Sequence, residues 1–382
     1  MAVQPGVSPF PPSFPSSRRE LRAARSRPAS LAREGWADSA KGLCILLVVL
    51  GHAAGLYGVL DAEIPAWVLQ AWNTIIMAFK PIRVPLFFLI SGYFAHRALQ
   101  RPWRLTFRLR VAQNAYLYVL WVALLGLFFN VVIRPQFGGV DYTWEGVWAQ
   151  LLNPISHPWY LYALVVYFVI AKLMARKQWK GVATGVAAAL YLGAGHPWLP
   201  LPANLCGGLV FFLVGSYWPE VVRLMAYRLN PKKVASLLGA YLGMALVVRL
   251  LGISEINAAM LLLSMLAVPA SVAIFARFQE HNIVTRGLTW VGKRTLPVYV
   301  LHFPLLVIVS WLVQNLPTTL APSGASNIFY LILPILATLL AAGGALGIHA
   351  ILTRVPVGTW LFQLPAMSDH SEQRQRRNRS RM

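Results

Sequence analysis

The stretch Trp36-Ala-Asp38-Ser-Ala-Lys41-Gly-Leu-Cys-Ile-Leu-Leu-Val-Val-Leu-Gly51-His52 decides the fold of this chain. An apolar run follows the charged residues Asp38 and Lys41, and it continues to an ionisable histidine. About 20 mostly apolar residues in helical form are needed to cross the hydrocarbon core of a bilayer, so this run predicts a membrane-spanning helix. Lys41 and His52 are eleven positions apart. At about 100° and 1.5 Å per residue, they lie on one helix face, about 16 Å apart along the axis.

The composition of the whole chain supports a membrane protein. Of its 382 residues, 57% are hydrophobic and 12% are charged, whereas about a quarter of a soluble protein is charged. These values exclude a disordered chain and an ordinary soluble enzyme, because so few charges cannot cover a soluble surface. The net charge of +22 would suggest nucleic acid in a soluble protein. In a chain this apolar, the positive charge indicates Lys and Arg residues that are concentrated on one side of a membrane. We therefore expect no nucleic-acid partner.

Apolar segments of spanning length recur along the sequence, and none alternates as a barrel strand does. We therefore predict an all-α, polytopic integral membrane protein. Pro81 and Pro85 predict a broken or kinked second span. The ten predicted spans are about 42–60, 69–96, 111–133, 158–175, 181–195, 203–218, 234–252, 258–276, 296–315 and 328–352.

The distribution of positive charge predicts the orientation. With both termini in the cytoplasm, the cytoplasmic segments hold all of the 34 Lys and Arg residues except Lys80, Arg83, Arg134 and Arg249. This asymmetry is what the positive-inside rule requires. We predict a disordered basic cytoplasmic tail over 1–35, a transmembrane domain over 36–355 and a basic cytoplasmic C-terminal tail over 356–382. The first span lacks a cleavage site of small residues, so we expect an anchor and not a removed signal peptide.

Ionisable groups inside a span are energetically costly and point to function. His52 can act chemically or can simply bond a neighbouring helix, and the cation aligned below it favours function. Lys41 is either a functional cation or a positive-inside anchor whose ammonium reaches the interface. Asp38, one turn earlier, can pair with Lys41, and Gly51 permits close approach of a helix or ligand beside the imidazole.

Five stretches in order resemble the acyltransferase-3 family of membrane acyltransferases, in particular its fucose 4-O-acetylase-like members. The first is Asp38-x-x-Lys41-Gly with its apolar run to His52. The resemblance covers about 36–355. The other four stretches are Arg83-Val-Pro-Leu-Phe-Phe-Leu-Ile-Ser91-Gly-Tyr-Phe, Trp159-Tyr-Leu-Tyr162-Ala-Leu, Phe211-Phe-Leu-Val-Gly215-Ser-Tyr and Gly292-Lys-Arg294-Thr-Leu-Pro-Val-Tyr-Val-Leu-His302-Phe-Pro304.

The resemblance implies transfer of an acyl group, usually acetyl from acetyl-CoA, to a hydroxyl of a carbohydrate or other cell-envelope acceptor, in a bacterial cytoplasmic membrane. It implies that the family's basic residue and histidine correspond to Lys41 and His52, with an arginine near position 83. We therefore expect catalysis by His52, Lys41 and Arg83, with His52 as general base. A covalent acyl-histidine stays open. Many members carry Arg where this chain has Lys41, and lysine lacks the planar fork that binds phosphate bidentately.

Further polar residues are candidates for binding. Acyl-CoA is polyanionic, so we expect it to meet a set of residues at the cytoplasmic rim: Lys41, Asp38, Arg97, Lys293 and Arg294. Ser91 either eases helix packing or touches ligand, Trp159 is either an interfacial aromatic or a platform for a sugar, and His302 either bonds a helix or takes part in the site. We expect no metal site, because His and Cys lack ligand spacing on any one segment.

A second class of function fits the same residues. Intramembrane His, Lys and Arg can line the path of a carrier or channel for a small solute or an acyl group. No Asp or Glu falls in the middle of a predicted span, which weakens that alternative. Labelled acetyl-CoA separates the two classes, because an enzyme forms acylated product or free CoA.

Overall fold

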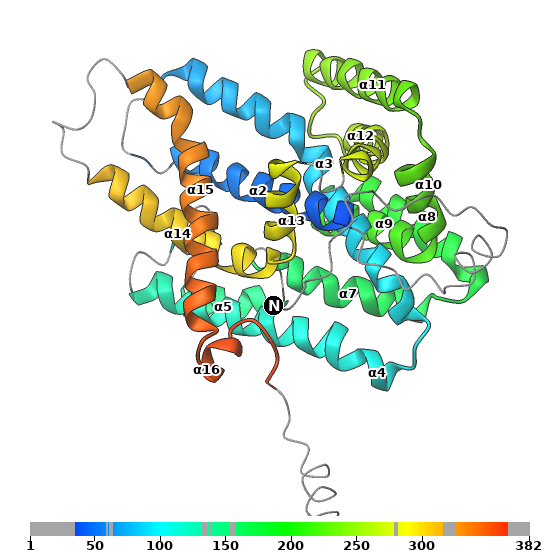
Figure 1. Ribbon diagram of the computed structural model, residues 1–382, viewed down its shortest axis with the longest axis horizontal. Coiled ribbons are helices and arrows are strands. Elements are labelled where there is room, and N and C mark those ends of the chain that lie inside the picture. Colours follow the sequence, from blue (N-terminus) through cyan, green and yellow to red (C-terminus); the bar gives the residue numbers. More distant parts are fainter. Residues whose placement is uncertain are drawn as a thin grey trace, which may run out of the picture. The chain divides into compact units, whose positions relative to one another are not determined.

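A computed structural model describes residues 35–58, 60, 64–131, 136–137, 140–141, 143–152, 154, 157–278, 282–315 and 326–365. Each predicted span falls on a helix (Figure 1), which confirms the all-α polytopic class. The corresponding helices are α2 (Gly35–Gly55), α3 (Ala66–Leu99), α5 (Gln113–Val131), α7 (Trp159–Leu173), α8 (Lys177–Gly193), α9 (Ala203–Tyr217), α11 (Pro231–Leu250), α12 (Asn257–Arg277), α14 (Thr295–Gln314) and α15 (Ser326–Leu352).

Length and composition divide these helices into groups. Seven helical segments of the described chain are long and apolar enough to cross a membrane, and α9 with α10 (Pro219–Arg228), bent by 86°, makes an eighth if the pair is one span. Helix α7 is apolar but has only 15 residues. The count of ten spans and the cytoplasmic position of both termini stay predictions.

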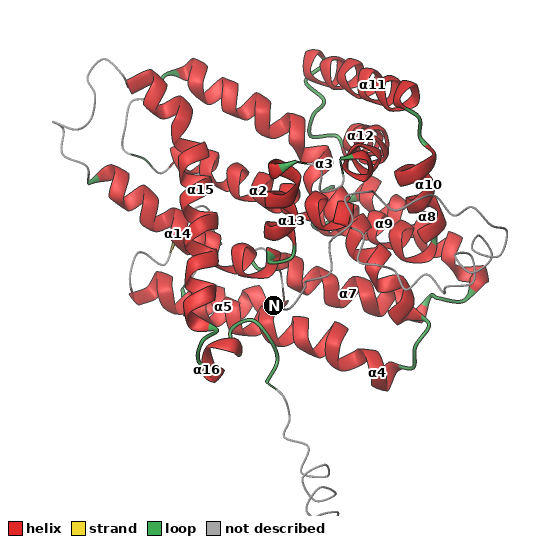
Figure 2. Cartoon of the chain, in the orientation of Figure 1, coloured by secondary structure: helices red, strands yellow, loops and turns green. Residues whose placement is uncertain are grey.

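Helix also forms outside the predicted spans, and helix dominates throughout the residues drawn in Figure 2. A π-helical stretch, η2 (Arg108–Ala112), joins α4 (Trp103–Phe107) to α5. An antiparallel pair of two-residue strands, β1 (Gln136–Phe137) and β2 (Val140–Asp141), follows α5 in the chain. The remaining short helices are η1 (Leu56–Gly58), α6 (Trp144–Leu152), α13 (Ile283–Gly292) and α16 (Pro356–Thr359).

Helix α3 continues through Pro81 and Pro85, so the second span is not broken there; a kink stays a prediction. Proline removes one backbone donor and crowds the preceding turn. Helices inside a membrane tolerate it where neighbouring helices and side chains take over the freed backbone groups. Here α3 contacts α9, α2 and α12, so packing on several sides supports the helix.

Two helix pairs approach so closely that glycine is required. A Cβ on Gly92 of α3 would overlap the carbonyl oxygen of Phe212 on α9, and one on Gly215 of α9 would overlap the carbonyl oxygen of Leu89 on α3. The same relation joins α2 to α13, where a Cβ on Gly292 would overlap the carbonyl oxygen of Asp38. Backbone-to-backbone packing at small residues is the usual way to associate helices in lipid. These crossings fix α3 and α13 beside the helices that carry the predicted site.

The described residues continue to 365, beyond position 355, where the transmembrane domain is predicted to end; that boundary stays a prediction. Phe362 is buried against α5, and the indole nitrogen of Trp121 donates to the carbonyl oxygen of Leu361 at 2.9 Å. The predicted disordered tails fall largely outside the described residues, at 1–34 and 366–382.

Replacing Gly215 by alanine tests the crossing of α3 and α9. The added methyl must push against backbone, so we expect the variant to lose about 1–3 kcal/mol of stability, the usual range for overpacking. Thermal unfolding in detergent measures the loss as a lower Tm. The matched control is Gly239→Ala on α11, where an added Cβ meets nothing within 4 Å. Equal Tm values for the two variants would contradict the assigned role of Gly215.

Candidate active site

Three histidines from distant parts of the sequence meet around α2. The His52 ring centroid lies 5.0 Å from that of His157, which precedes α7, and 5.3 Å from that of His302 on α14. The His157 ring stacks on Phe303 at 3.2 Å. The predicted intramembrane histidine is thus the centre of an imidazole cluster. In the described part of the chain, no group of three or more His, Cys, Asp or Glu residues is arranged to hold a metal ion.

Arg83 of α3 lies directly against α2 beside the histidine cluster. Its Nη1 donates to the carbonyl oxygen of Leu47 at 3.3 Å, and a Cβ on Gly51 would overlap the same nitrogen. Gly51 is therefore the residue that makes room for the guanidinium. The buried Nε of Arg83 has no hydrogen-bond partner among the described residues. A buried donor without a partner costs about 1–3 kcal/mol, so a ligand oxygen at this position would be favoured.

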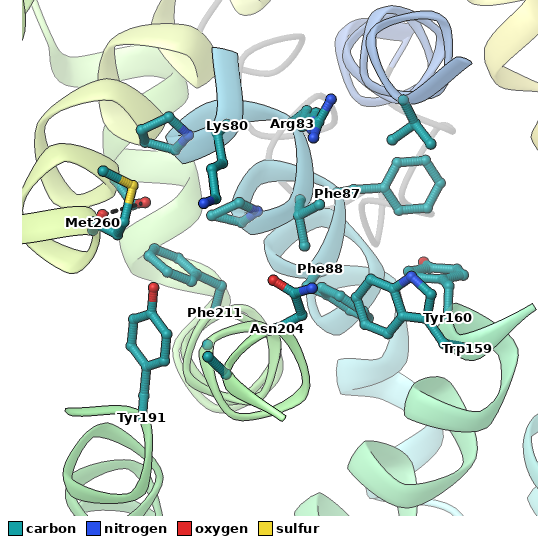
Figure 3. A pocket seen from close by; sticks show the side chains of 18 of the residues that line it. Lys80, Arg83, Phe87, Phe88, Trp159, Tyr160, Tyr191, Asn204, Phe211 and Met260 are labelled. Carbon is teal, nitrogen blue, oxygen red and sulfur yellow. Dashed lines mark hydrogen bonds between the residues drawn. The ribbon is translucent and has the colours of Figure 1, made fainter. Parts of the chain in front are cut away.

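A cavity of about 250 Å³, here called the histidine cavity, opens beside His52 and Arg83 (Figure 3). Figure 3 shows Lys80 of α3 directed into it, with Trp159 and Tyr160 of α7 on one side. The Lys80 ammonium lies 3.8 Å from exposed Glu255. The other lining residues are Ile45, Val48, Pro81, Val84, Pro85, Phe87, Phe88, Tyr191, Ala203, Asn204, Gly207, Gly208, Phe211, Met260, Ser264 and Tyr299.

A second cavity of about 250 Å³, here called the lysine cavity, contains Lys41. The ammonium of Lys41 lies 3.0 Å from the carboxylate of Asp38, whose side chain is fully buried. The predicted pairing of these two residues is therefore confirmed. Arg110, from the π-helical stretch η2, adds a second cation to the lining. The remaining lining residues are Phe87, Ser91, Phe94, Ala95, Gln113, Asn114, Leu117, Tyr160, Leu161, Leu164, Phe168, Phe212, Thr295, Leu296 and Tyr299.

The two cavities share three aromatic walls: Phe87, Tyr160 and Tyr299. The Tyr160 hydroxyl lies 2.6 Å from the Ser91 hydroxyl, and the backbone N–H of Tyr160 donates to the Tyr299 hydroxyl at 2.9 Å. The Phe87 ring meets the Tyr160 ring edge-on at 4.9 Å. Lys41 and His52 thus face two chambers on either side of one aromatic partition. The sequence predicts Lys41 and His52 on one face of α2, and in the structure each of them lines one of these two neighbouring cavities.

The other predicted binding residues take different positions. Trp159 lines the histidine cavity and Ser91 the lysine cavity, while His302 lines neither and lies behind His52. Arg97 and Lys293 are exposed, and Arg294 lies over the Trp290 ring at 4.7 Å. These last three cations line neither cavity. Lys293 and Arg294 directly precede Thr295 and Leu296, which border the lysine cavity.

Sequence reasoning did not assign Arg110, Tyr160, Asn204 or Tyr191 to the site. In the sequence Arg110 is one of several arginines in a predicted cytoplasmic segment. It lies in a π-helical stretch, and such a stretch has no reliable sequence signal, so the direction of its side chain could not be predicted. The sequence also gives no role to His157, which reaches His52 from the segment before α7. For Tyr160 the signal was present in the aromatic stretch beginning at Trp159, but sequence does not tell which ring faces inward.

Comparison with known proteins identifies the family of this chain. The profile of the acyltransferase domain, acyltransferase-3, matches residues 34–361. The chain therefore belongs to the acyltransferase-3 family of membrane proteins. Among curated proteins it is similar to Escherichia coli (strain K12) inner membrane protein YcfT, with 24% identity over 303 residues, covering 73% of this chain and 81% of that protein. No solved structure matches.

Cysteine labelling tests the lysine cavity. We expect Ser91→Cys to react with a small uncharged maleimide, because position 91 borders the cavity. The matched control is Ser216→Cys on α9, since Ser216 is 1% exposed and lines neither cavity. Native Cys44 and Cys206 are buried and should react slowly. Mass spectrometry of folded protein counts the labels, and equal labelling of the two variants would rule out an accessible cavity at Ser91.

Proposed function

We propose that this protein is a membrane O-acyltransferase that moves an acyl group, acetyl in the first instance, from cytoplasmic acyl-CoA to a hydroxyl of a carbohydrate or other envelope acceptor. One observation carries the proposal: a cavity with cations and a cavity with a histidine and an arginine lie on either side of a shared aromatic partition. The E. coli relative is an inner membrane protein by name, and we infer a bacterial cytoplasmic membrane here.

The lysine cavity suits the donor. Acyl-CoA carries phosphates. Two cations in the lining can bind them: the ammonium of Lys41 and the planar guanidinium of Arg110. Asp38 holds Lys41 by a 3.0 Å ion pair and so orients the ammonium. Arg97, Lys293 and Arg294 add positive charge near the rim, which draws a polyanion toward the mouth. The pantetheine arm would then extend along α2 past Tyr160 toward His52.

The histidine cavity suits the chemistry. His52 as a neutral imidazole takes the proton of the acceptor hydroxyl while that oxygen attacks the thioester carbonyl. The carbonyl oxygen gains negative charge, and the unused Nε donor of Arg83 can stabilise it. The carbon–sulfur bond then breaks, the thiolate takes the proton from the imidazolium, and an ester and free CoA result. Direct transfer needs only these groups; a covalent acyl-histidine would use the same atoms in two steps.

The lining of the histidine cavity also suits a sugar. Trp159 supplies an aromatic face for a pyranose, and Asn204 and Tyr191 supply an amide and a hydroxyl for hydrogen bonds. Lys80 adds a cation directed into the cavity (Figure 3). This combination fits a polyhydroxylated acceptor better than an apolar one.

Membranes supplied with labelled acetyl-CoA test the proposal. We expect the wild type to release CoA and form an acetylated envelope product. The rate of His52→Ala should be lower by a factor of about 10²–10⁴, the usual contribution of a general base. Product is measured by mass spectrometry and free CoA by its thiol. Wild-type activity in His52→Ala would refute the assignment of His52, and transport without CoA release would favour a carrier.

Gly51→Ala tests the place of Arg83. The added methyl overlaps the guanidinium, which lies at the end of a flexible side chain, so the fold should tolerate it while Arg83 moves away. We expect the rate to fall by up to about 10²–10³, the cost of losing one oxyanion donor, with Tm little changed. The control is Gly55→Ala on the same helix, where a Cβ meets nothing within 4 Å. Full activity of Gly51→Ala would separate Arg83 from the reaction.

A further inference from the structure

The hydrogen bonds of His302 fix its tautomer. Its Nδ1 lies 2.6 Å from the carbonyl oxygen of Tyr299 and 3.1 Å from that of Val298. Carbonyl oxygens only accept hydrogen bonds, so Nδ1 must carry the proton. In the neutral ring the lone pair is then on Nε2. The side chain is 1% exposed, and Nε2 has no hydrogen-bond partner among the described residues.

This acceptor lies next to the proposed base. The rings of His302 and His52 are 5.3 Å apart between centroids, with 37° between their planes. The two rings share no hydrogen bond in the structure, but at this separation a rotation of the His52 ring or one intervening water could join their nitrogens. No hydrogen bond to either nitrogen of His52 occurs within the described part of the chain. A buried acceptor without a donor and a partly buried imidazole that can donate therefore lie side by side.

We propose that His302 is a positioning residue: its Nε2 accepts a hydrogen bond from one ring nitrogen of His52, directly or through a water, and leaves the other nitrogen as the base. This inference rests on the proposed function. In other histidine-based sites, a hydrogen-bond partner on one ring nitrogen fixes the tautomer and the orientation of the imidazole. His302 would have this role toward His52. Once His52 takes the acceptor's proton, the same bond stabilises the imidazolium until the thiolate removes that proton.

The surrounding charges allow this role. Arg83 from α3 is a cation beside His52, and His157 lies on another side, held by a hydrogen bond from the Tyr299 hydroxyl to its backbone carbonyl. Because Tyr299 also offers its carbonyl to His302, one turn of α14 positions both neighbours of His52. Nε2 of neutral His302 is therefore an acceptor for the proton of His52 when His52 is an imidazolium.

Steady-state kinetics of the full chain in nanodiscs, with acetyl-CoA and its acceptor membranes, test the proposal. We expect His302→Leu to lower kcat by about 10- to 100-fold, the usual effect of removing such a partner. The KM for acetyl-CoA should not change, because His302 lines neither cavity. His302→Gln should recover a large part of kcat, since its amide oxygen can accept the bond. The matched control is His349→Gln on α15, whose ring packs on Phe362 and whose activity should match the wild type.

Each alternative result has a defined meaning. Wild-type kcat in His302→Leu, or equal loss in the Leu and Gln variants with a raised KM, would overturn the positioning role. Two further measurements in the same preparation separate this inference from the proposed function. Absence of CoA release by the wild type would refute the proposed function itself, whereas full activity of His52→Ala would refute only the assignment of His52.

A spectroscopic measurement does not depend on turnover. In protein labelled with ¹⁵N-histidine, the Nε2 resonance that disappears in His302→Gln should be that of an unprotonated, hydrogen-bonded nitrogen. It should shift in His52→Ala, because its donor is removed. A resonance unaffected by His52→Ala would overturn the proposal.

Discussion

Contact of helix backbones at glycine is the constraint on which the site depends. Lipid tails are as apolar as leucine, so apolar burial alone does not draw helices together, and close packing must. Gly92 and Gly215 bring α3 against α9, and Gly292 brings α13 against α2. At Gly51 the close contact is with a side chain. The guanidinium of Arg83 occupies the space that a Cβ at position 51 would need. The guanidinium of Arg83 is thereby held against the helix that carries His52.

Polar groups in this interior satisfy one another or remain available to a ligand. Asp38 and Lys41 pair within one helix turn, while Ser91, Tyr160 and Tyr299 link α3, α7 and α14 through hydroxyl groups. Groups of this kind are costly in a membrane unless they bond or function. The buried Nε of Arg83 and Nε2 of His302 are left without partners in the described chain, and both lie beside His52. Unused hydrogen-bonding capacity is therefore concentrated where we propose that the reaction occurs.

The aromatic partition gives the proposed reaction a direction. Donor phosphates need cations and water, whereas acyl transfer benefits from a site that excludes water. Phe87, Tyr160 and Tyr299 separate the cavity with Lys41 and Arg110 from the cavity with His52 and Arg83. A thin arm could pass between them while the charged part of the donor stays behind. The same arrangement would keep an envelope acceptor and a cytoplasmic donor on opposite sides until they meet at His52.

The sequence by itself determined the class of fold, the helical segments, and the line that joins Lys41 to His52, because hydropathy and the period of 3.6 residues act locally along the chain. It also indicated the Asp38–Lys41 pair, which lies within one turn. Only the tertiary structure decided which distant residues join that line. His157 and His302 reach His52 from segments more than 100 positions away, and Arg110 and Tyr160 enter the cavities through a π-helical turn and a choice of helix face. Such contacts depend on how the helices rotate and cross, and the period of one helix carries no information about the rotation of its neighbour.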